Sequence, residues 1–112
     1  MIDIQITQNF SVETLKAGFI QQIKNAVNSA VLFGEAAIVR DTPVDTSFLQ
    51  NNWKHEEAKQ EGSLVYAIIY NNTKYAPYIE YGTRKMKPFM MVRKNIPKID
   101  KQLKDDLERI KI

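Results

Sequence analysis

A sustained amphipathic repeat between residues 12 and 40 constrains this 112-residue chain more than any other feature. Apolar residues recur there at steps of three and four, which is the spacing of one face of a helix. A helix of that length spans roughly 43 Å at 1.5 Å per residue, so the rest of the chain must pack along it. Small residues make one side of this predicted helix thin, and we expect another backbone to approach closely there. These small residues are Ala26, Ala30, Gly34 and Ala37.

Two other segments have the patterns of β-strands. Residues 2–6 alternate isoleucine with polar residues, which predicts a short strand with one buried face. Residues 64–70 are rich in β-branched and aromatic side chains, and a Gly62–Ser63 turn signal precedes them. With the polar residues 53–60 as its partner, this segment predicts a hairpin whose first arm is an edge strand or a solvent-exposed strand.

Proline and glycine mark where the remaining elements begin and end. Pro43 ends the long helix, because the residue before a proline disfavours the helical conformation. Residues 75–83 predict a short helix with Pro77 in its first turn and Gly82 just past its end.

A second apolar stripe of helical spacing runs from Phe89 to Ile110. Pro97 lies inside it and predicts either a kink or a break that opens a new helical segment. The prediction for the whole chain is an α+β fold in one domain, residues 1–112. A small antiparallel sheet with a β-hairpin packs against a long N-terminal helix and a C-terminal helix.

Composition argues against most site chemistry. The chain has no cysteine, which excludes disulfides and thiolate catalysis, and its one histidine, His55, lies in a polar segment without further metal-ligand residues. Asp41 and Asp45 are close in sequence. They suit turns or helix caps, with a two-carboxylate or magnesium site as the alternative. We expect no catalytic residue, no cofactor and no metal.

No targeting or membrane segment is predicted. No apolar run approaches the roughly 18 to 20 residues of a membrane span. The N-terminal residues lack the basic and apolar regions of a secretory signal. We therefore expect a protein that is made and used in the cytoplasm or inside an assembly built there.

Charge is unevenly distributed along the chain. Residues 1–83 contain 6 bases and 9 acids, whereas residues 84–112 contain 10 bases and 4 acids. Residues 84–98 form a basic tract with six bases and no acid. Such a tract favours contact with nucleic acid or with an acidic protein surface, and a solvated face is the simpler alternative. The candidate contact residues are Arg84, Lys85, Lys87, Arg93 and Lys94.

All five tyrosines fall within residues 66–81. They are Tyr66, Tyr70, Tyr75, Tyr78 and Tyr81. Tyrosine suits protein interfaces, where one end of the side chain is apolar and the other meets water. Stacking of nucleobases is the alternative, and we favour a core or subunit interface.

Three segments in order carry a resemblance to a known family. They are Thr42-Pro43-Val44-Asp45-Thr46 with Leu49 and Trp53 following, then Tyr75–Thr83, and then Pro88-Phe89-Met90. This pattern resembles the HK97 gp10-like family of tailed-bacteriophage proteins, which act at the head–tail junction as neck or tail-completion components. In that family the last motif opens the final helix. Two departures are Ser47, where the family usually has glycine, and a shorter and more polar arm over residues 55–63.

The resemblance implies a structural virion protein without catalysis, built from identical copies in a ring. It also implies assembly in the host bacterial cytoplasm and partners among head-closure or connector proteins and tail-tube proteins, with non-specific DNA contact possible in the channel. It leaves open whether the protein is a tail terminator or a neck protein. The interface or motif residues carried over are Pro43, Asp45, Thr46, Leu49, Trp53, Tyr75, Tyr78, Glu80, Tyr81, Gly82, Pro88 and Phe89.

Asp45 and Glu80 give the sharpest predictions among these residues, because a charged side chain in an otherwise apolar motif needs a partner. The simpler interpretations are a turn cap for Asp45 and a solvated Glu80, and Phe89 is expected to dock the last helix. Two functions of other classes remain as alternatives. One is a small nucleic-acid-binding module that uses the basic tract and the tyrosines, and the other is an enzyme that uses His55, Asp41 or Asp45.

Overall fold

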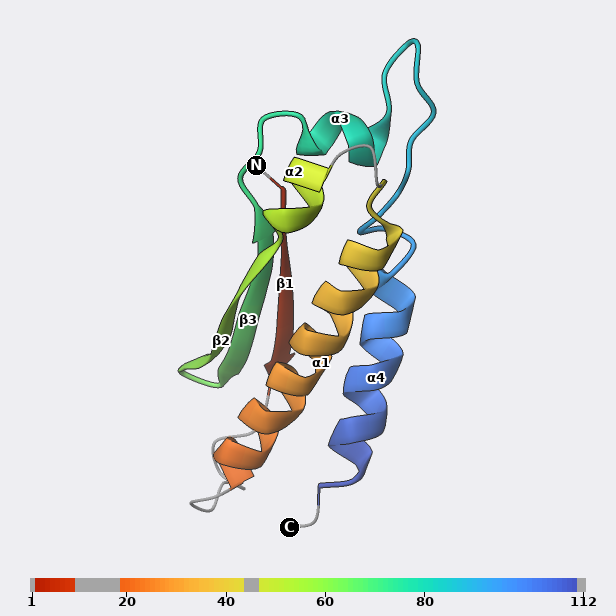
Figure 1. Ribbon diagram of the computed structural model, residues 1–112. Coiled ribbons are helices and arrows are strands. Elements are labelled where there is room, and N and C mark those ends of the chain that lie inside the picture. The colour runs from red at the N-terminus through yellow and green to blue at the C-terminus, as the bar shows by residue number, and fades with distance from the viewer. Residues whose placement is uncertain (1, 10–18, 44–46, 111–112) are drawn as a thin grey trace.

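The computed structural model describes residues 2–9, 19–43 and 47–110, and these residues form two layers (Figure 1). One layer is a three-stranded antiparallel sheet with strand order β1-β3-β2. Its strands are β1 (Ile2–Asn9), β2 (Lys54–Glu61) and β3 (Leu64–Asn71). The second layer consists of the two longer helices. The predicted α+β class, with its β-hairpin, is confirmed.

The strand β2 lies at an edge of the sheet, as its polarity predicts. Its pairing with β3 shifts register between Glu56 and Lys59, and within this irregular stretch the Ala58 N–H donates to Asn28 Oδ1 of the long helix at 2.7 Å. The other edge strand, β1, is longer than the predicted residues 2–6. It continues to Asn9 because β3 offers a pairing partner as far as Leu64.

The long helix, α1 (Phe19–Asp41), ends where the sequence predicts. The predicted residues 12–18 of that helix lie outside the described residues. The helix α4 (Ile96–Glu108) runs beside α1 (Figure 1). A Cβ at Gly34 would lie 2.7 Å from Ile99 Cδ1, so a side chain of α4 packs tightly against the small-residue side, whereas the close approach of another backbone stays a prediction.

Alternation along β3 divides its side chains between two environments. Val65, Ala67 and Ile69 are fully buried, or nearly so, beneath the helices. The intervening residues, on the face that the helices leave open, are only half-buried (Figure 1). They are Leu64, Tyr66, Ile68 and Tyr70. The five tyrosines therefore have two kinds of surroundings, since Tyr66 and Tyr70 belong to this open sheet face and the other three do not.

The C-terminal helix begins at Ile96, with Pro97 in its first positions. Of the two alternatives for Pro97, the break that opens a new segment is confirmed. The expected opening of the helix at Pro88-Phe89-Met90 is wrong. The N–H groups of Phe89 and Met90 donate instead to the carbonyls of Ile79 and Glu80, at 2.9 and 3.2 Å, and Met90 has a positive φ of 54°. This conformation is incompatible with a helix at that point.

Two short helices, α2 (Ser47–Asn51) and α3 (Ala76–Tyr81), lie at one end of the molecule (Figure 1). The predicted short helix is confirmed in α3, with Pro77 in its first turn and Gly82 as its C-cap. The segment after Gly82 rises beyond the rest of the molecule before the chain turns back toward α4 (Figure 1). The elongated shape, 52 × 22 × 22 Å, therefore has one end built of short helices and loops. No helix among the described residues is both long enough and apolar enough to cross a membrane.

Candidate interaction surface

The residues of the first motif anchor the end of α1 to the sheet. Thr42 is buried, and its hydroxyl donates to the Ile38 carbonyl at 2.7 Å and accepts from Trp53 Nε1 at 2.9 Å. Trp53 and Leu49 are themselves buried in the core. Pro43 follows directly and is half-buried. The described residues of this motif therefore contribute to packing in the core at the end of α1. The predicted contacts of Asp45 and Thr46 lie outside the described residues.

A buried amide holds α2 against the end of β3. Asn71 is fully buried, and its Nδ2 donates to the Leu49 carbonyl at 2.9 Å. Its Oδ1 accepts from the N–H and the hydroxyl of Thr73, at 3.0 and 2.7 Å. No sequence pattern described above singled out Asn71. An asparagine that directly follows a strongly apolar strand is the signal that could have indicated a buried link.

Glu80 is 1% exposed, and its partners lie within the same chain. Its carboxylate accepts from the N–H of Val92 at 2.9 Å and from the N–H and Nε of Arg93 at 3.0 and 3.1 Å. Arg93 also donates through Nη2 to the Glu80 carbonyl at 2.8 Å. The expectation that this charge needs a partner is met, and the alternative of a solvated Glu80 is wrong. Glu80 joins α3 to the turns before α4.

A second polar link joins the end of α1 to the same turns. Asn95 is buried and donates through Nδ2 to Asp41 Oδ2 at 2.8 Å and to the Met91 carbonyl at 2.7 Å. The Asn95 hydrogen bond, followed by the charges of Lys94, Arg40 and Lys98, lowers the pKa of Asp41, while partial burial opposes this shift. Asp41 therefore acts as an ionised acceptor that fixes the last turn before α4.

The aromatic residues at this end point outward from that scaffold. We call the five exposed ones, Phe48, Tyr75, Tyr78, Tyr81 and Phe89, the apical surface. Tyr78 and Tyr81 are 60% and 61% exposed, and their spacing of three places them on one side of α3. The rings of Phe48 and Tyr75 lie 6.4 Å apart, beside an apolar hollow of about 430 Å³. The Arg93 guanidinium lies 4.7 Å from the centre of the Tyr81 ring.

Phe89 belongs to this apical surface and does not pack under the last helix. Its side chain is 44% exposed, whereas the neighbouring Met91 and Val92 are buried. The Phe89 N–H donates to the Ile79 carbonyl, which fixes its backbone to α3. Phe89 is therefore available for contact with another protein.

A basic arm, residues 83–88, follows α3 and projects beyond it at the same end of the molecule (Figure 1). Its turn is closed by the pairing of Thr83 with Met86, with N···O distances of 2.9 and 3.3 Å. Arg84, Lys85 and Lys87 are exposed. The other two predicted basic contact residues have partners within the chain. Arg93 pairs with Glu80, and Lys94 Nζ lies 4.0 Å from Asp41 Oδ1. The structure thus separates the predicted basic tract into an arm facing solvent and a part committed to the scaffold.

The described residues contain no group of three or more metal-ligating side chains. His55 of β2 contacts the Glu35 carboxylate of α1, and both side chains are half-buried. This pair joins the sheet to α1, and among the described residues no hydrogen bond or ion pair links His55 to Asp41. Asp45 of that alternative lies outside the described residues.

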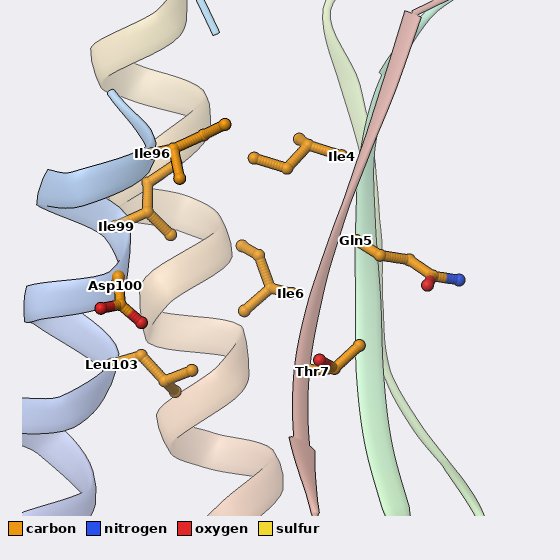
Figure 2. A pocket seen from close by; sticks show the side chains of 8 residues that line it. All are labelled: Ile4, Gln5, Ile6, Thr7, Ile96, Ile99, Asp100 and Leu103. Carbon is orange, nitrogen blue, oxygen red and sulfur yellow. The ribbon is translucent and has the colours of Figure 1, made fainter. Parts of the chain in front are cut away.

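A small groove follows the seam between β1 and α4 (Figure 2). Ile4 and Ile6 point toward Ile96, Ile99 and Leu103, whereas the strand's polar side chains point to the other side of the sheet (Figure 2). The volume of this groove, about 170 Å³, is below the range typical of sites for drug-sized ligands. The groove is therefore the solvent-exposed edge of the hydrophobic core and not a site for such a ligand.

A hydrogen-bonded scaffold that presents exposed aromatic and basic side chains is typical of a protein that works by binding another macromolecule. Over residues 8–82 the chain matches the family model described as "Bacteriophage HK97-gp10, putative tail-component". This match spans more than half of the chain, which therefore belongs to the HK97-gp10-like family of phage structural proteins. No curated protein and no solved structure matched the chain significantly.

Proposed function

We propose that this protein joins head and tail in a tailed phage or prophage, as a neck or tail-completion (terminator) component that forms a homo-oligomeric ring. The single observation that carries the proposal is the apical surface, in a chain that belongs to a phage tail-component family. Large aromatic side chains held out into solvent by a buried polar scaffold favour a protein interface. The protein then acts without catalysis or cofactor, as one domain over residues 1–112, in the virion at the head–tail junction.

The motif residues divide into two roles under this proposal. Scaffold residues set the geometry from inside, and contact residues meet the neighbouring protein. The scaffold set is Pro43, Leu49, Trp53, Glu80, Gly82 and Pro88. The contact set is Tyr75, Tyr78, Tyr81 and Phe89, with Asp45 and Thr46 as further candidates. The partners are other copies of this chain, a head-closure or connector protein, and a tail-tube protein.

The first experiment is to measure solution mass by light scattering over a concentration series, with negative-stain images of the same fractions. Closed rings of one copy number are the expected result. A phage or prophage from which this gene is deleted should release filled heads and separate tails that fail to join, and the purified protein should restore joining in the lysate. Normal joined particles from the deletion strain would contradict the proposal.

A second candidate function, nucleic-acid binding, is favoured by one observation. The exposed bases of the basic arm lie beside the exposed tyrosines of α3, and such a combination can hold a phosphate backbone and stack bases. Fluorescence anisotropy with labelled single-stranded and duplex DNA measures this directly. Binding that weakens steeply between about 50 and 200 mM salt supports it. No binding at low salt eliminates it.

A further inference from the structure

The open face of the sheet has a hollow near the end of the molecule that carries α2 and α3. Its lining comes from all three strands and the residue after β3: Asp3, Glu56, Ile68, Tyr70 and Asn72. Its volume is about 310 Å³. Asp3 pairs with Tyr70 across one strand boundary, and Glu56 pairs with Ile68 across the other. Two carboxylates therefore flank an apolar floor, which suits the charged head and apolar stem of a lysine or arginine.

The basic arm has the complementary chemistry. Arg84, Lys85 and Lys87 are exposed, and within the described chain no acidic side chain lies at ion-pair distance from them. The arm is also held in a defined shape. Gly82 precedes the arm with a φ of 80°. The Thr83–Met86 pairing closes the arm, and Thr83 Oγ1 accepts from the Lys85 N–H at 3.2 Å. A held arm loses less conformational entropy on binding than a loose one.

The positions of the two features match a contact between copies. The arm lies at one end of the elongated molecule, on the side of α4 (Figure 1). The strand ends that line the hollow lie at the same end, on the side of the sheet (Figure 1). We propose that the basic arm of one copy docks in the Asp3/Glu56 hollow of the next copy. This inference rests on the proposed ring function and names the contact that builds the ring.

Such a contact joins two different patches, so it is heterologous and propagates from copy to copy. With both patches at one end, neighbouring molecules stand side by side with their long axes roughly parallel. The assembly closes into a ring if the rotation per copy divides a full turn, and otherwise it continues as a filament. The apical surfaces of all copies then face the same way, toward the next component of the tail.

Two bases near the hollow limit its negative charge. Lys59 lies 3.6 Å from Glu56, with both side chains largely exposed, and Lys54 faces Tyr70 across the β2–β3 pairing. Lys54 is therefore a position where a change should strengthen docking. Lys54→Glu adds a third carboxylate beside the same floor, whereas Glu56→Lys reverses one of the two carboxylates that the arm needs.

The natural absence of cysteine allows a direct test by disulfide trapping. The full chain carrying Lys85→Cys together with Glu56→Cys is oxidised at a concentration where the wild type assembles, and the products are separated on a non-reducing gel. A ladder that extends beyond dimers is expected. The matched control pairs Lys85→Cys with Glu61→Cys, which is on the same strand but at the opposite end of the hairpin, and should give no ladder. Each single cysteine variant can form dimers at most.

Charge variants give an independent measurement by light scattering. Glu56→Lys should raise the concentration for half-assembly about tenfold, and Lys54→Glu should lower it, each by roughly 1.4 kcal/mol of contact free energy. Wild-type rings with no ladder from the Lys85/Glu56 pair would overturn this inference and leave the ring function standing. A wild type that stays monomeric at every concentration, and that joins no heads to tails in the lysate, would overturn both.

Discussion

Glu80 shows how one buried carboxylate can organise a surface that it does not reach. The segment before α4 begins with N–H groups that have no helical carbonyl to bind, and Glu80 accepts two of them from the end of a different helix. Arg93 balances the charge and also covers one side of the Tyr81 ring. The position of the outward tyrosines therefore depends on a side chain that is 1% exposed.

Replacing Glu80 by glutamine should lower the free energy of unfolding by about 1–3 kcal/mol. The amide presents a donor where the carboxylate accepts, so a buried N–H loses its partner. Urea denaturation followed by circular dichroism measures the change. Glu108→Gln, at an exposed position on α4, is the matched control and should change stability by less than about 0.5 kcal/mol. Equal stability of both variants would show that the Glu80 hydrogen bonds contribute nothing.

Asp41 makes stability depend on acid pH in a direction that its surroundings set. The Asn95 hydrogen bond and the nearby bases lower the pKa of Asp41 in the folded protein below its ordinary value of 3.8. The stabilisation is therefore fully present above the unfolded pKa and is lost as pH falls through the folded one. Asp41→Asn should be less stable than the wild type at pH 7, and the difference should shrink as the pH falls below 3.8. Thermal melts of the variant and the wild type across this pH range measure the difference in stability. A difference that stays constant at every pH would contradict this role of Asp41.

At the scale of elements, the junction between α3 and the basic arm depends on a glycine. Gly82 has a φ of 80°, and a Cβ there would lie 2.7 Å from the Met86 carbonyl oxygen and 2.8 Å from Pro88 N. Both of those atoms belong to the backbone of the arm, which is closed by the Thr83–Met86 pairing. A side chain at this position therefore has to displace the arm.

Gly82→Ala should cost at least about 2 kcal/mol of unfolding free energy, because backbone strain and a steric clash act together. Gly62 is a natural control, because its φ of 59° is also positive and a Cβ at that position would meet no atom within 4 Å. Gly62→Ala should cost only about 1 kcal/mol. Denaturant midpoints of the two variants measure the difference, and equal losses would show that the close approach at Gly82 is unimportant.

At the scale of the whole molecule, the two layers leave one sheet face and one end uncovered. The helices α1 and α4 occupy the opposite face, and the short helices hold aromatic side chains at the end (Figure 1). A molecule of this shape can contact neighbours both beside it and beyond its end. That geometry suits the proposed role of a ring component between head and tail.

Tyr78→Ser should impair assembly or head–tail joining with little effect on stability, less than about 0.5 kcal/mol, because the side chain is 60% exposed. Leu32→Ser is a matched control, since Leu32 is 59% exposed on the outer side of α1. Complementation of a deletion phage by each variant, with joined particles counted by electron microscopy, measures the effect. Loss of joining in Leu32→Ser alone would place the functional contact on α1 instead.

The sequence by itself determined the elements, because their signals are local. The three-and-four repeat predicted α1 and Pro43 predicted its end. The apolar strand and its turn predicted the hairpin, and Pro77 with Gly82 predicted the two ends of α3. It also indicated that Glu80 needs a partner and, by its ordered motifs, the family. One local signal misled, since the apolar stripe around Phe89 continues that of α4 while its backbone bonds to α3.

Only the tertiary structure decided which residues meet. Asn95 and Asp41 are 54 positions apart and Asn71 and Leu49 are 22 apart, and their hydrogen bonds exist because α4 packs on α1 and α2 on the end of β3. The division of the tyrosines between the sheet face and α3, and of the basic tract between arm and scaffold, follows from the same packing. No local pattern encodes such pairs, because a buried polar group takes whichever partner the fold brings within reach.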